Sequence, residues 1–203
     1  MKIWVFILGL FISVTSFSQE IEVDYVSPFH GDMAAVQKGD QWGFINEKGE
    51  MVLEYRSDLV ASQNDGDQSY PAFVSGRALI KKMKEGIWHY GYIDTKGEPI
   101  IDAVYVNATD FKDGHAIVLK VNKETLGRNE VLGKDVIAYS YNEVVIDAQG
   151  ELVAFLRGPV NLQYDKEFLK ENPKIQSKFL SDKLVATKEE TKGWVLHPIK
   201  GRM

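Results

Sequence analysis

The chain has 203 residues, of which 44% are apolar and 26% charged, and its formal net charge is −5. These are ordinary globular values, so they exclude a disordered chain, and the length suffices for one domain with a hydrophobic core. An acidic chain binds a phosphate backbone poorly, so we predict no nucleic-acid partner. The absence of cysteine excludes disulfides, thiol nucleophiles and cysteine metal sites.

The first 18 residues have the pattern of a secretory signal peptide. Lys2 precedes an almost wholly apolar stretch over residues 3–14, and Ser-Phe-Ser at 16–18 places small residues at positions −3 and −1 of a cleavage site. About twelve apolar residues are fewer than the roughly 20 that span a bilayer. No cysteine is present for lipid attachment. We therefore predict a mature protein that begins at Gln19, is periplasmic or extracellular, and does not insert into the membrane.

Residues 41–50, QWGFINEKGE, have a near copy at residues 89–98, HYGYIDTKGE. Both copies place an aromatic residue and a glycine within an apolar stretch, at Trp42-Gly43 and Tyr90-Gly91. Glycine inside a strand marks a bulge or the close approach of another backbone. We predict that Trp42 and Tyr90 cover that approach as core or seam residues; the alternative is that they stack on a ligand.

Each copy ends in a tight turn that begins with Asn or Asp and closes with glycine, and a third such turn follows later in the chain. An Asn or Asp side chain bonds the backbone two residues on, and glycine accepts a positive φ. Apolar residues on both sides predict β-hairpins. The turn residues are Asn46 with Gly49, Asp94 with Gly97, and Asp147 with Gly150.

A second landmark precedes each turn. FVSGRALI (73–80) and FKDGHAIV (111–118) share Phe-x-x-Gly-x-Ala and two apolar residues, and FHGDMAAV (29–36) fits with Asp32 in the glycine position. Aspartate tolerates left-handed backbone better than most residues. Each unit therefore reads as about three strands, and the chain contains three such units in succession.

The units differ most in length at residues 56–72 and 122–134. Insertions between repeats map to loops, and loops on a regular scaffold often carry function. We therefore predict partner contacts there, although both segments could also be tolerated surface loops. Arginine is enriched at interfaces. The candidate contact residues are Tyr70 in the first segment and Leu126, Arg128 and Leu132 in the second.

The pattern changes after residue 159, which divides the chain into a signal peptide (1–18), a repeat domain (19–159) and a C-terminal segment (160–203). Within 164–184, Pro173 interrupts apolar residues at helical spacing, which predicts one or two short helices that cap the open sheet edge. These apolar residues are Phe168, Leu169, Ile175, Phe179 and Leu180. Lys192-Gly193-Trp194-Val195 looks like the decayed start of a fourth unit.

The aromatic-Gly steps, turn glycines and Phe frames resemble the WG-repeat family, also called KWG repeats. The resemblance is good over residues 29–105 and weaker to about 155, because Glu143-Val144 replace the aromatic-Gly pair in unit three. It implies a bacterial β-rich interaction scaffold and supplies no catalytic residue. We expect an all-β array of WG-type hairpins in a curved antiparallel sheet, solenoid-like or propeller-like, with a helical C-terminal cap.

No motif predicts a catalytic, cofactor-binding or metal-binding residue. GRNEVLGKD (127–135) is not a phosphate loop, because five residues separate its glycines and Asp135 follows the lysine. The four histidines are at least 26 residues apart, which excludes a local zinc motif. Asp94 and Asp147 could suggest a glycosidase pair, but their turn positions already explain them.

We therefore predict a non-catalytic exported scaffold that binds an unknown protein or a glycan in the bacterial envelope. One alternative is a hydrolase of envelope polymers whose site is built from the insertions. Another is a structural repeat protein without a defined ligand. An enzyme should gather two or more acids or histidines in one deep pocket, which separates it from a scaffold.

Overall fold

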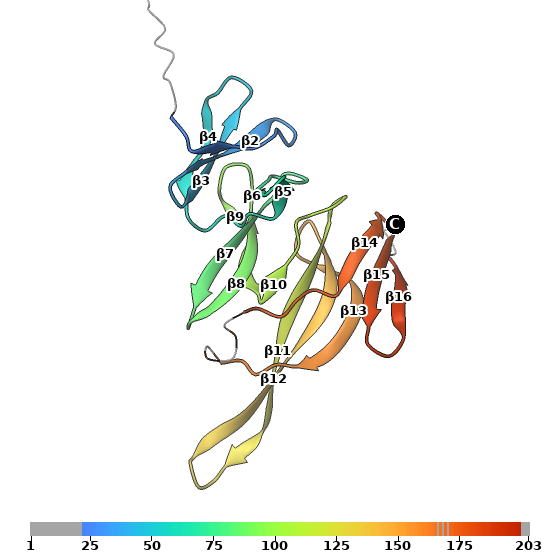
Figure 1. Ribbon diagram of the computed structural model, residues 1–203. Coiled ribbons are helices and arrows are strands. Elements are labelled where there is room, and N and C mark those ends of the chain that lie inside the picture. The colour runs from blue at the N-terminus through green and yellow to red at the C-terminus, as the bar shows by residue number, and fades with distance from the viewer. Residues whose placement is uncertain (1–21, 166, 168, 170, 200–203) are drawn as a thin grey trace, which may run out of the picture.

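The structure is a computed structural model that describes residues 22–165, 167, 169 and 171–199 (Figure 1). The predicted signal peptide, Gln19 and Phe168 lie outside the described residues. The described residues form sixteen β-strands and no α-helix, all of their strand pairs being antiparallel. The all-β repeat fold is thus confirmed, and the strands form several separate sheets.

Units one and two share one plan, a hairpin followed by a third strand, and unit one has in addition a short strand before its hairpin. Unit one pairs its strands in the order β1-β2-β3-β4, and unit two in the order β7-β8-β9. In unit two an isolated bridge from Leu59 to Ile80 takes the place of the short first strand. The strands of unit one are β1 (Tyr25–Val26), β2 (Met33–Lys38), β3 (Gln41–Asn46) and β4 (Met51–Arg56). Those of unit two are β7 (Ala78–Lys84), β8 (Ile87–Ile93) and β9 (Pro99–Tyr105).

The first insertion, residues 56–72, forms its own two-stranded hairpin of β5 (Gln63–Asp65) and β6 (Gln68–Tyr70). Unit three repeats the plan with longer strands in the order β10-β11-β12-β13. Its strands are β10 (Asn107–Ala108), β11 (His115–Asn129), β12 (Lys134–Asp147) and β13 (Leu152–Asn161).

The C-terminal segment forms a three-stranded sheet, which we call unit four, of β14 (Ser177–Ser181), β15 (Leu184–Glu189) and β16 (Gly193–Pro198). The predicted helix is therefore wrong for residues 177–184. Apolar residues four apart fit a strand face as well as a helix face, and burial here follows the strand period, with Ser177 buried and Lys178 exposed. Gly193 has φ 74° and closes the turn between β15 and β16. It is therefore equivalent to the turn glycines Gly39 and Gly86, and not to Gly43 and Gly91, which lie inside strands.

At the start of the main hairpin, each of the four units repeats one burial pattern, a half-buried residue followed by three buried ones. It occurs at residues 33–36, 77–80, 115–118 and 184–187. Three consecutive buried residues mean that both faces of the sheet are covered, because side chains alternate between faces. The run of buried residues on this short strand therefore indicates stacked sheets.

The core clusters show which sheet covers each face. Ile80 packs with Phe44 of unit one, whereas its neighbour Leu79 packs with Val118 of unit three. In the same way, Ile117 turns away from unit two and packs with Val185 of unit four. The sheets of units one to four follow one another from the N-terminal to the C-terminal unit (Figure 1). Each unit thus buries its faces against its neighbours, as in a solenoid.

Glu143 explains why unit three departs from the aromatic-Gly pattern. It stands opposite Leu119, the register position that Trp42 holds opposite Gln37 in unit one. Glu143 is only 1% exposed, and its Oε1 accepts hydrogen bonds from the backbone amides of Gln176 (3.0 Å) and Ser177 (2.7 Å). The carboxylate therefore fixes the start of unit four to unit three.

Candidate functional site

The three Asx turns have one geometry, in which the first side chain holds the backbone of the turn. Asn46 Oδ1 accepts hydrogen bonds from the amides of residues 48 (2.9 Å) and 50 (3.0 Å). Asp94 and Asp147 bond the equivalent amides at 2.9–3.0 Å. The closing glycines Gly49, Gly97 and Gly150 have φ of 76°, 84° and 83°. These side chains hold turns and are not gathered in one pocket.

Gly43 and Gly91 lie where the third strand of their unit approaches the hairpin. A Cβ on Gly91 would lie 2.5 Å from the Ile101 carbonyl oxygen and 2.6 Å from the Ala103 amide nitrogen. Trp42, beside Gly43, is 8% exposed and meets the Tyr25 ring edge-on at 5.9 Å. Trp42 therefore packs in the core, and Tyr90, beside Gly91, is half-buried.

We expect Gly97→Val to destabilise the protein by roughly 1–3 kcal/mol, the scale of strained backbone sites. Gly97 has positive φ, and a Cβ there would lie 2.7 Å from Leu53 Cδ1 of unit one. Gly49→Val is the matched control, because Gly49 has the same turn conformation but nothing within 4 Å of its Cβ position. Chemical denaturation should show the larger loss for Gly97→Val. Equal losses would mean that the contact between the units contributes nothing.

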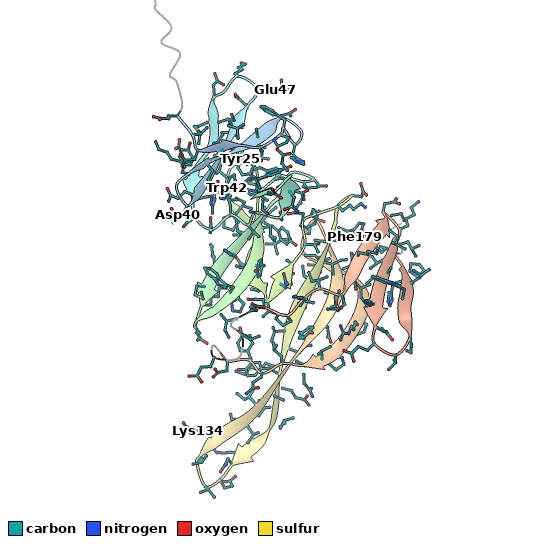
Figure 2. The ribbon with its side chains drawn as sticks, viewed as in Figure 1. Tyr25, Asp40, Trp42, Glu47, Lys134 and Phe179 are labelled. Atoms are coloured by element: carbon teal, nitrogen blue, oxygen red, sulfur yellow. The ribbon has the colours of Figure 1, made fainter. Side chains whose placement is uncertain are left out.

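The second insertion, residues 122–134, lies within an arm that we define as residues 122–139, the outer part of the β11–β12 hairpin. It projects from the body, and the label of Lys134 marks its outer part, far from Trp42 (Figure 2). The segment predicted as a loop is instead paired strand, from Asn122 opposite Ser140 to Asn129 opposite Lys134. Its apolar side chains are exposed, by 93% for Val131, 67% for Leu132 and 63% for Leu126.

The predicted contact residues do not all meet on this arm. Leu126, Arg128 and Leu132 all lie in the outer part of the arm, where Arg128 Nη2 donates a hydrogen bond to the Gly133 carbonyl oxygen at 3.3 Å. Tyr70 is 3% exposed, and its hydroxyl lies 2.7 Å from His30 Nε2. Its prediction as a surface contact is wrong, because β6 packs this ring into the core of unit one.

A cavity of about 660 Å³ lies where all four units meet. Its walls combine repeat residues with residues of the first insertion. The side chains important here are His30 of unit one, Ser62 and Gln63 of the insertion, Asp110 and Lys112 of unit three, and Phe179 of unit four.

Asp110 is an acidic side chain in the wall of this cavity. Gln63 Nε2 donates a hydrogen bond to its Oδ2 at 2.6 Å, while Oδ1 is inaccessible to solvent and has no hydrogen-bond partner among the described residues. Burial raises the pKa of Asp110, against the lowering effects of Ser62, Gln63 and the His30 charge. Within the described part of the chain, no basic side chain forms a salt bridge with it.

We expect Asp110→Asn to raise the melting temperature at pH 7. Because burial raises the pKa of Asp110 in the folded state, stability is highest below the unfolded-state pKa and falls as pH rises through the folded pKa. Asparagine removes this cost while its oxygen can still accept from Gln63. The gain should vanish at about pH 3, where the carboxyl is protonated in both states. Thermal melts across this range, with the exposed Asp102→Asn as control, test the sign; parallel curves for wild type and Asp110→Asn would contradict it.

Sequence reasoning missed the cavity residues, although one signal was present. Asp110 directly precedes Phe111, and the equivalent positions before Phe29 and Phe73 hold Pro28 and Ala72. A charged residue in a place that is apolar in the other units marks a local departure from the repeat. The described residues hold no group of three or more His, Asp or Glu side chains that could bind a metal, and no helix that could span a membrane.

The family comparison agrees with this geometry. A model described as WG containing repeat matches residues 20–42, 42–62 and 90–123. The chain therefore contains WG repeats. The matches cover the hairpin and third strand of unit one and run from β8 of unit two into β11 of unit three. No curated protein and no solved structure matches the chain.

Proposed function

We propose that this WG-repeat protein is an exported, non-catalytic scaffold that binds a protein partner through the tip of its arm. The observation that carries the proposal is the exposure of Leu126, Val131 and Leu132 on one projecting hairpin. Single exposed apolar residues are normal on protein surfaces, but apolar residues gathered on one projection are typical of an interaction site.

Apart from Tyr139, which stacks on Tyr164 at its base, the arm makes no contact with the core that would explain its presence. Units one and two close the equivalent hairpin with two residues, Gly39-Asp40 and Glu85-Gly86. In unit three, no residue from 122 to 139 is buried. A paired extension that buries no side chain beyond Tyr139 is better explained by what it contacts outside the chain.

The charges on the arm favour a protein partner over a polyanion. Lys123, Arg128 and Lys134 are balanced by Glu124, Glu130 and Asp135, so the arm carries no net charge. A phosphate backbone or an anionic membrane surface requires a basic excess. An apolar tip between charges of both signs suits an apolar groove with a polar rim on another protein.

Export supports an envelope or extracellular partner and rests on the signal-peptide pattern of residues 1–18. We expect the mature protein from its native host to begin at Gln19. Intact-mass spectrometry of the purified protein decides this, and a product that retains Met1 would exclude the proposed location.

The test of the arm is a shortened variant. Lys123 stands opposite Tyr139, so Asn-Gly in place of residues 124–138 would close the hairpin with the kind of two-residue turn that antiparallel strands favour. Because no buried side chain is removed, we expect the variant to fold. The control is Ile100→Ser with Val104→Ser, which alters two exposed apolar residues on β9.

The partner is identified by affinity capture from the native host with wild type and both variants, then purified for direct titration. We expect shortening to weaken its Kd at least tenfold and the control to change it less than twofold. A partner that binds the folded shortened variant as tightly as wild type would remove the arm from recognition. If the wild-type protein binds no purified candidate, the proposed binding function is wrong and the protein is a purely structural repeat protein.

A hydrolase of envelope polymers is the second candidate, because His30 and Asp110 line one cavity together with Ser62 and Gln63 of an insertion. However, His30 Nε2 is bonded to Tyr70 and Asp110 Oδ2 to Gln63, which ties both groups to protein partners. We expect no turnover of peptidoglycan or polysaccharide. Turnover that Asp110→Asn abolishes would establish the enzyme in place of the scaffold.

A further inference from the structure

We propose that the cavity between the repeats binds a hydroxyl-rich small molecule of the size of a mono- or disaccharide, with Asp110 and Gln63 as its main polar contacts. This site is separate from the arm and goes beyond the proposed function.

The polar residues of the cavity are not required by the repeat. Asp110 stands where the other units have Pro28 and Ala72. Ser62 and Gln63 come from the insertion 56–72, which the repeat plan also does not need. Two independent departures from the repeat thus meet at one place, joined by the 2.6 Å hydrogen bond from Gln63 to Asp110.

The energetics also favour a ligand over a structural role. A half-buried carboxylate that forms no salt bridge destabilises a fold, so stability alone would favour an uncharged residue such as the alanine of unit two. Perturbed acids in concave sites are often kept for binding or chemistry. Asp110 and Gln63 both line the cavity. A carboxylate accepts hydrogen bonds from hydroxyl groups, and an amide both donates and accepts them.

The size and the mixed character of the walls indicate the ligand class. About 660 Å³ lies within the roughly 300–1,000 Å³ usual for small-molecule sites. Asp110 is accompanied by the bases His30 and Lys112, so neither a simple anion nor a simple cation matches the site. A neutral sugar offers donors and acceptors together, and its apolar C–H faces suit the Phe179 side chain in the wall.

The test is isothermal titration of the full-length mature protein with glucose, galactose, N-acetylglucosamine and their β-1,4-linked disaccharides, and with alanine as an amino-acid probe. We expect at least one sugar to bind, Asp110→Asn to weaken its Kd at least tenfold, and Asp102→Asn to leave it unchanged. The arm-shortened variant should bind the sugar like wild type, which separates this site from the arm.

Three outcomes would overturn the proposal: no sugar binds wild type, alanine binds and no sugar does, or Asp110→Asn binds the sugar as tightly as wild type. The melting temperature of Asp110→Asn shows independently that the variant is folded, so loss of binding cannot be attributed to unfolding.

Discussion

Gly91→Ala should destabilise the protein by about 3 kcal/mol, at the upper end of the usual cost of overpacking. A methyl group at this position would lie 2.5 Å from the Ile101 carbonyl oxygen and 2.7 Å from the Asp102 carbonyl carbon, both backbone atoms of β9. Backbone atoms in a paired strand cannot move aside as a side chain can. The β8–β9 pairing should therefore be disturbed, as urea denaturation would measure.

Gly43→Ala is the matched comparison in unit one. Its methyl group would meet Met51 Cε at 2.7 Å and the Leu53 carbonyl oxygen at 2.9 Å. The end of a methionine side chain can move, so we expect Gly43→Ala to cost clearly less than Gly91→Ala. If Gly91→Ala unfolds at the same urea concentration as wild type, the close approach of β9 to β8 is not what selects glycine.

Glu143→Ala should destabilise unit four by about 3 kcal/mol, because hydrogen bonds to a charged group contribute about 1.5–3 kcal/mol each and the Ser177 amide left behind is buried. The amides of Gln176 and Ser177 both lose their acceptor. Their hydrogen exchange should accelerate together with that of β15, while β3 keeps its protection.

The exposed Glu124→Ala on the arm is the control, since Glu124 makes no buried contact. It should leave stability and exchange unchanged. Unaltered exchange at Gln176 and Ser177 in Glu143→Ala would show that unit four is held by its apolar contacts, Val185 with Ile117, and not by the carboxylate.

The sequence predicted those features of the fold that depend only on residues close together in the chain. The Asx turns need only Asn46, Asp94 or Asp147 and a glycine three residues later, so a short motif determines them. The strand content follows from alternation and from the repeated Phe frames. The predicted helix was wrong over residues 177–184, because apolar residues four apart, such as Ile175 and Phe179, satisfy both the helical and the strand period.

What depends on distant residues could not be predicted in the same way. Tyr70 sits in a polar insertion, and only the packing of β6 on unit one reveals that its ring is buried. The cavity brings His30, Gln63 and Asp110 together across 80 residues of sequence, which no local pattern indicates. The arm was placed correctly as the region where the units differ, but its strand pairing depends on register between β11 and β12.

The central claim, that the arm tip contacts a protein partner, is tested most directly by site-specific photocrosslinking in the native host. A photoreactive amino acid is placed at Val131, which is 93% exposed on the arm, and in a second strain at Val104, which is 50% exposed on β9. We expect one defined crosslinked protein from position 131 and none from position 104. No crosslink from position 131, or the same products from both positions, would contradict the claim.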